Sequence, residues 1–173
     1  MMIRNLIIVF GSAFAAIVIG VLIFLYSGLS ISNTYASAVN EYHPTAVAVP
    51  FMEIAHGTQS NVLARTNYLV TSVEELNKLW GIIDADGKVP SIDFSRNYVA
   101  AVFAGSQSTT GFTIEVSKVE DTSIRNVTVT ITEPGKDCSK KKSATAPYAV
   151  IELPKTSLHL AHEDQTTITD CSQ

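Results

Sequence analysis

One long apolar run near the N-terminus constrains this chain more than any other feature. The run extends from Leu6 to Tyr26, and only two glycines and one serine interrupt its aliphatic and aromatic side chains. As an α-helix it would be roughly 31 Å long, which matches the hydrocarbon core of a bilayer. A helix is expected because each backbone N–H and C=O must be satisfied within such a segment. The sequence therefore predicts an N-terminal transmembrane helix within residues 1–30.

Charge predicts the orientation of this helix. Arg4 is the single charged side chain before Glu41, so almost all of the 12 basic and 16 acidic residues follow the apolar run. Positive charge resists translocation, and the next basic residue after Arg4 is Arg65. We therefore expect a single-pass signal-anchor in the cell membrane, with its N-terminus in the cytoplasm and the C-terminal domain outside. The alternative is secretion after cleavage near Ala38, where Ala36–Ala38 offers a small-residue site.

The remainder of the chain reads as a linker followed by one domain. Residues 31–43 are rich in Ser, Asn and Ala and show no periodicity, which is typical of a tether. Residues 44–173 are sufficient for one domain. The net charge is −4, and the single basic run, Lys140–Lys142, is short. This composition excludes a multi-pass membrane protein, a disordered chain and a strongly basic nucleic-acid binder.

The two cysteines, Cys138 and Cys171, fit an extracytoplasmic location. An oxidising compartment permits a disulfide between them. Neither belongs to a C-x-x-C motif or has a histidine at ligand spacing beside it, which argues against a redox or metal pair. We predict a structural disulfide that pins the C-terminal tail to the loop containing Lys140–Lys142, here called the lysine-rich loop.

Apolar periodicity predicts a mainly β or α+β domain. Strands are expected over residues 47–57, 62–70, 98–104, 112–117, 127–132 and 148–153, with a short last strand within 165–171. Ser72 and Glu75 fit the capping pattern at the start of one amphipathic helix, whose apolar stripe comprises Val73, Leu76, Leu79, Trp80 and Ile83. The runs 112–117 and 127–132 predict an antiparallel hairpin. We therefore expect an antiparallel sheet of about six to seven strands with the helix packed on it.

Four segments carry a resemblance to a known family. Thr71–Trp80 resembles the pattern s-x-e-e-l-x-x-l-W, and Ile92–Gly105 resembles v-D-F-x-x-x-x-v-v-a-v-f-a-G. Thr109–Phe112 stands where the family usually has T-G-G-Y, and Ala146–Lys155 is similar to x-P-y-x-v-v-x-l-p-k. In this order and spacing the chain resembles the PrcB C-terminal domain family, small bacterial extracytoplasmic domains named for a subunit of a surface protease complex.

The resemblance implies an accessory role without chemistry of its own. Such a domain would bind or stabilise another extracytoplasmic protein, such as an exported protease. We expect partner binding in the loop after the central strand, at Gly105, Thr109, Thr110, Gly111 and Phe112. Thr110 replaces the first glycine of the family's T-G-G-Y pattern. No cofactor is expected, and the absence of G-x-S-x-G and H-E-x-x-H motifs argues against an enzyme.

The alternative function is a small-ligand or metal-binding extracytoplasmic sensor. His159 and His162 would share one face of a helix, with adjacent carboxylates as further ligands. Pro154 and the polar flanks favour an exposed connection instead, so no metal site is predicted. The loop 105–111 is rich in glycine and hydroxyl groups and could hold an anion. It lacks the P-loop lysine and a following helix, which favours a tight connection leaving the central strand.

Overall fold

The computed structural model describes residues 45–83, 85 and 87–171, all within the compact unit Pro44–Gln173. These residues form eight strands and one helix in two four-stranded sheets, whereas the sequence predicts a single sheet of six to seven strands. The predicted signal-anchor (1–30) and linker (31–43) lie outside the described residues. Within the described ranges, no helix is both long enough and apolar enough to cross a membrane.

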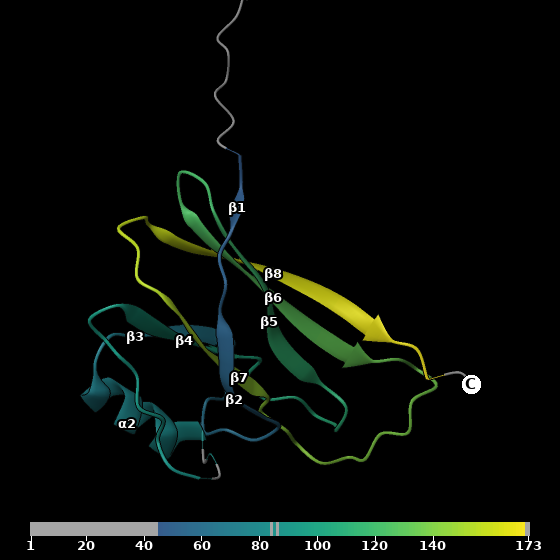
Figure 1. The fold of residues 1–173 in the computed structure, drawn as a ribbon. Helices are drawn as coiled ribbons and strands as arrows, with labels where there is room; N and C mark the ends of the chain where they lie inside the picture. Colours follow the sequence, from purple (N-terminus) through teal and green to yellow (C-terminus); the bar gives the residue numbers. More distant parts are fainter. Residues whose placement is uncertain (1–44, 84, 86, 172–173) are drawn as a thin grey trace, which may run out of the picture. The chain divides into compact units, whose positions relative to one another are not determined.

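One sheet, here called the helix-covered sheet, is antiparallel and has the order β2-β7-β4-β3. Its strands are β2 (Met52–Gly57), β3 (Thr66–Val70), β4 (Asn97–Phe103) and β7 (Tyr148–Pro154). From Tyr98 to Phe103 the sequence of β4 is continuously apolar, as expected for a strand with a core on each face. Helix α2 (Val73–Ile83) covers one face of this sheet (Figure 1), and the core between them includes Leu76, Leu79, Trp80, Ile83, Val99, Ala101, Phe103 and Val150.

The start of α2 follows the predicted capping pattern with one shift. The Ser72 hydroxyl accepts from the Glu75 N–H at 3.2 Å, as expected. The Glu75 carboxylate reaches one residue further back, where the Thr71 N–H donates at 2.7 Å and the Thr71 hydroxyl at 3.0 Å. These bonds lower the pKa of Glu75. Val73, predicted on the apolar stripe, is instead 59% exposed. It is the first residue of α2, and the buried residues of the helix begin one turn later, at Leu76.

The second sheet, here called the hairpin sheet, has the order β1-β5-β6-β8. Its strands are β1 (Val47–Ala48), β5 (Thr113–Asp121), β6 (Arg125–Pro134) and β8 (Leu160–Thr169). The predicted antiparallel hairpin is confirmed, with Ile114 opposite Ile131 and Val116 opposite Val129. The apolar side chains of this hairpin belong to a second core cluster, together with Val102, Ala104, Ala149, Ile151 and Leu153 of the other sheet.

The segment 47–57, predicted as one strand, is divided between the two sheets. β1 pairs with β5, and β2 pairs with β7. Pro50 lies between them and has no N–H to continue a ladder. The Val49 N–H donates the last bond on the hairpin sheet, to the Val119 carbonyl at 2.8 Å, before the chain crosses to the other sheet.

The last strand is longer than predicted and parallel to its neighbour. β8 includes residues 160–164, which were predicted as an exposed connection, and it pairs with β6 in parallel. That prediction was wrong because this sequence lacks apolar alternation. An edge strand whose side chains are mostly exposed needs little of it, since backbone bonds to β6 supply the pairing.

Two carboxylates stabilise connections in the fold. Asp93 accepts from the Ser95 hydroxyl at 2.5 Å, from Arg96 Nε at 2.8 Å and from the Ser95 N–H at 3.0 Å, and these bonds lower its pKa to about 2. Asp121 accepts from Nε and Nη2 of Arg125 at 2.7 Å each. This bond from Arg125 lowers the pKa of Asp121 and closes the β5–β6 turn.

Candidate functional site

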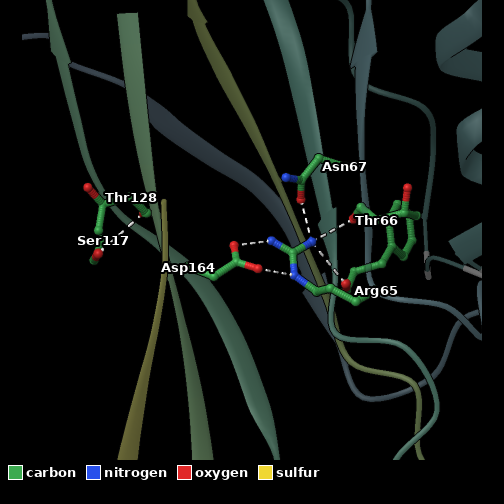
Figure 2. Close-up of polar contacts among 7 residues, drawn as sticks. Arg65, Thr66, Asn67, Ser117, Thr128 and Asp164 are labelled. Atoms are coloured by element: carbon green, nitrogen blue, oxygen red, sulfur yellow. Dashed lines mark hydrogen bonds and ion pairs between the residues drawn. The ribbon is translucent and has the colours of Figure 1, made fainter. Parts of the chain in front are cut away.

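An ion pair joins the two sheets at their free edges. Arg65 immediately precedes β3, the edge of the helix-covered sheet, and Asp164 lies in β8, the edge of the hairpin sheet. Arg65 Nε donates to Asp164 Oδ2 at 2.8 Å, and Nη2 donates to Oδ1, so the pair is bidentate (Figure 2). Two parallel charge-assisted bonds fix the orientation of both groups. We call this pair the edge latch.

The remaining donors of Arg65 bind its own sheet. Nη1 donates to the Thr66 carbonyl at 2.8 Å, to Asn67 Oδ1 at 2.5 Å and to the Phe103 carbonyl at 3.2 Å. The Arg65 side chain is 25% exposed and that of Asp164 is 37% exposed. The bonds to β3 and β4 therefore fix the position of the guanidinium that binds Asp164 of β8.

A cavity of about 190 Å³ lies between the two edge strands. In the register of β3 with β4, Asn67 and Leu69 lie opposite Val102 and Ala100, which belong to the core between the sheets. From the hairpin sheet, the lining includes Val127, Leu160 and His162. The cavity is therefore a mainly apolar groove, here called the inter-sheet groove, whose polar side chains are Asn67, Tyr68 and His162.

A second cavity, of about 290 Å³, lies between β3 and helix α2. Tyr68 and Leu69 line both cavities, and each of these side chains is 45% exposed. Leu79 and Ile82 of α2 add apolar lining, with Glu75 and Lys78 as charged members. β3 is thus an edge strand with a cavity on each side.

The other sheet edges carry features that discourage pairing with another chain. β1 has two residues, and β2 has a register shift between Glu53 and Ala55. β8 carries Glu163 and Asp164, and charged side chains of this kind disfavour added strands. β3 has no charged residue, no proline and no register shift between Thr66 and Val70. Among the described strands, it is the edge best suited to accept another strand.

Gly105, the first residue of the predicted partner-binding loop, positions the segment that leads into β3. Its φ is +75°, and a Cβ there would lie 2.8 Å from the Arg65 nitrogen and 3.0 Å from the Leu63 carbonyl oxygen. The Ser106 N–H donates to that carbonyl at 2.9 Å. A residue other than glycine would displace the backbone that carries Arg65.

The other predicted loop residues contact the lysine-rich loop instead of β3. The Thr110 N–H donates to the Lys141 carbonyl, and the Lys141 N–H donates to the Thr110 hydroxyl, both at 3.1 Å. The Thr145 hydroxyl donates to the Thr109 carbonyl at 3.1 Å. The two loops are therefore fastened together.

Gly111 and Phe112 lead from this loop into β5. Gly111 has a φ of +100°, and a Cβ there would lie 2.9 Å from Cβ of Pro134. Phe112 is half-buried immediately before the strand. The structure thus separates the predicted site: Gly105 lies beside the β3 segment, and Thr109–Phe112 lie beside the lysine-rich loop. Partner binding by these residues stays a prediction.

The two histidines considered for the alternative function do not share a face. His162 lies in β8 and lines the inter-sheet groove, whereas His159 precedes the strand. Residues three apart on a strand face opposite sides, so the shared helical face was a wrong premise. In the described part of the chain, no group of three or more His, Cys, Asp or Glu residues could hold a metal ion.

Trp80 is buried, as a core residue should be, and its Nε1 has no hydrogen-bond partner among the described residues. It lines a separate cavity of about 360 Å³ together with His56, Lys88 and Tyr148.

The disulfide between Cys138 and Cys171 is confirmed, with Cα atoms 5.0 Å apart. It joins Cys171, two residues after the end of β8, to the segment that follows β6. The C-terminal tail is therefore pinned beside the lysine-rich loop, as predicted.

Comparison with known families agrees with the core of this fold. Residues 98–154 match the family model described as PrcB C-terminal. The resemblance is thus confirmed over β4 to β7, which include the central strands of both sheets. No curated protein and no solved structure matches the chain. The PrcB C-terminal match includes the loop 105–112, whereas Arg65, β3, α2 and β8 lie outside it.

Sequence reasoning missed the edge latch and the exposure of Tyr68 and Leu69. The uncharged stretch Thr66–Val70, which directly follows an arginine, was the available signal. It could not show that β3 lies at an edge, because edge position depends on the order of strands.

Proposed function

We propose that this protein is a non-catalytic accessory subunit that binds an exported protein, with an extended segment of that partner added as a strand along β3. One observation carries the proposal. β3 is an uncharged, regular edge strand, and Tyr68 and Leu69 separate two cavities along it.

The geometry suits strand addition. An added strand would bond through its backbone to β3, and its successive side chains would point to opposite faces. Alternate side chains would then enter the inter-sheet groove and the cavity beside α2. The edge latch holds the β3 and β8 edges together at the start of β3, so the groove exists before the partner binds. Such preorganisation lowers the entropy cost of association.

The comparison supports the accessory part of the proposal. The PrcB C-terminal match suggests a role beside a protease, so we propose an exported protease as the partner. We also propose that the N-terminal segment is a retained membrane anchor with the domain outside. Tethering both proteins to one membrane would raise their effective concentration.

Site-specific photo-crosslinking in native cells tests this proposal. A photoreactive amino acid replaces Tyr68 at the β3 edge, or Met52 at the opposite edge of the same sheet as a matched control. Met52 is 57% exposed, so both positions are accessible. We expect one exported protein to crosslink from position 68 and not from position 52. A third replacement, at Phe112, tests the loop predicted from the sequence.

Introducing a charge on each edge strand is the second part of this experiment. Leu69→Lys should abolish the crosslink from position 68, because a lysine disfavours both strand addition and burial in the groove. Met52→Lys should leave it unchanged. The proposal is wrong if position 68 yields no specific product, or if Leu69→Lys and Met52→Lys have equal effects.

A further inference from the structure

The lysine-rich loop holds positive charge that the rest of the fold leaves unneutralised. Five basic side chains of the domain are in ion pairs with carboxylates: Arg65, Lys78, Arg96, Lys118 and Arg125. Lys136, Lys140, Lys141 and Lys142 are all exposed, and none has a carboxylate partner among the described residues. We propose that this lysine-rich loop, residues 136–145, binds an acidic segment of a protein partner.

The backbone of the lysine-rich loop is fixed in place although its lysine side chains are exposed. The disulfide holds Cys138, and the reciprocal bonds with Thr110 hold Lys141. At the far end, Thr145 exchanges two backbone bonds with Gln107, at 2.7 and 3.0 Å. The ammonium of Lys140 is turned toward the Pro134 carbonyl at 3.2 Å. A charged surface on a fixed backbone loses less entropy on binding than a flexible tail does.

The loop lies at one end of the hairpin sheet. The chain enters the hairpin sheet at β1, which pairs with Glu120 and Asp121 beside the β5–β6 turn. The lysine-rich loop follows Pro134 at the other end of β6, as Figure 1 shows. It therefore lies at the end of the hairpin sheet opposite the β5–β6 turn.

Charge complementarity indicates that the partner segment is acidic. The whole chain carries a net charge of −4, so an acidic ligand is repelled by most of its surface. Asp137 lies in the loop, Glu133 precedes it and Asp170 adjoins Cys171, which is bonded to Cys138; the four lysines outnumber these three carboxylates. An acidic segment is therefore attracted to one place, and the attraction should weaken with salt. This contact is separate from the β3 edge and does not depend on strand addition there.

A peptide-binding assay tests the proposal with the full chain reconstituted in phosphatidylcholine nanodiscs. The probe is a fluorescein-labelled poly-glutamate peptide, and its anisotropy is measured at about 50 mM and about 300 mM salt. The test variant is Lys140→Gln/Lys141→Gln/Lys142→Gln. The control variant, Lys88→Gln/Arg96→Gln/Lys155→Gln, removes the same charge elsewhere. All six side chains are exposed, and unfolding temperatures are measured alongside.

We expect the loop variant to bind the peptide about tenfold more weakly and the control variant to change affinity by less than about twofold. Higher salt should weaken wild-type binding and leave the loop variant nearly unchanged. Equal losses in both variants would show a net-charge effect and overturn the proposal. Recruitment of phosphatidylglycerol vesicles without peptide binding would overturn it too, since the occupant would then be lipid.

Discussion

The edge latch between Arg65 and Asp164 offers the sharpest test of how the two sheets are held together. Asp164→Asn removes the charge of the carboxylate and keeps its shape. Arg65→Met removes the guanidinium and keeps much of the apolar stem. The two variants and their combination form a double-mutant cycle, which isolates the energy of the pair from the other contacts of each residue.

The structure sets the expected magnitudes. Asp164 is 37% exposed, so solvent screens the pair, and its bidentate geometry places it at the upper end of the range for surface ion pairs. We expect Asp164→Asn to lower the free energy of unfolding by about 1 kcal/mol. Arg65→Met also loses the bonds to Thr66, Asn67 and Phe103, so it should cost about 2–3 kcal/mol. The coupling should be about 1 kcal/mol, or about 4 °C in melting temperature.

Thermal and urea unfolding of the full chain measure the cycle. Lys78 and Glu74 on α2 supply the matched control, because their side chains are 69% and 79% exposed and their coupling should be about 0.3–0.5 kcal/mol. The latch coupling should fall at about 1 M salt, where screening is strong. A latch coupling no larger than that of the helix pair would refute the reasoning, since the bidentate geometry would then contribute nothing measurable.

Three further predictions concern single features of the fold. The pKa of Asp93, near 2 in the folded chain, lies below the usual 3.8 of an aspartate, so its stabilising effect should be complete above about pH 4 and lost as the pH falls toward 2. Unfolding midpoints of wild type and Asp93→Asn should therefore converge at about pH 2, and a constant difference would contradict this. Gly105→Ala should destabilise by about 2 kcal/mol or more because of its positive φ and backbone clash, whereas Gly81→Ala in α2, with open space around it, should stabilise by about 0.5–1 kcal/mol. Equal denaturation midpoints for the two glycine variants would be inconsistent with that geometry. Cys138→Ser/Cys171→Ser should cost about 3–4 kcal/mol by freeing a loop of 33 residues, and an unchanged melting temperature would show that β8 pairing alone holds the tail.

Local features of this protein could be predicted from its sequence because they depend on neighbouring residues. The hairpin follows from the alternation around Ile114 and Val129, which holds whatever the rest of the fold does. The start of α2 follows from Ser72 and Glu75, whose side chains bind backbone groups within four residues. The disulfide was predicted from there being two cysteines in a chain expected to be exported, and it is present. For the hairpin and the start of the helix, the interaction energy is set by residue type and short spacing.

The candidate site required the tertiary structure. Arg65 and Asp164 are 99 positions apart, and nothing in either segment signals the other. β3 lies at an open edge because β4 pairs with β3 on one side and with β7 on the other, and because the chain divides into two sheets at Pro50. β8 forms through backbone bonds to β6, with side chains that carry no strand pattern. Periodicity records which face of a strand is buried, whereas the order of strands, and hence which edges stay open, is decided by packing between distant segments.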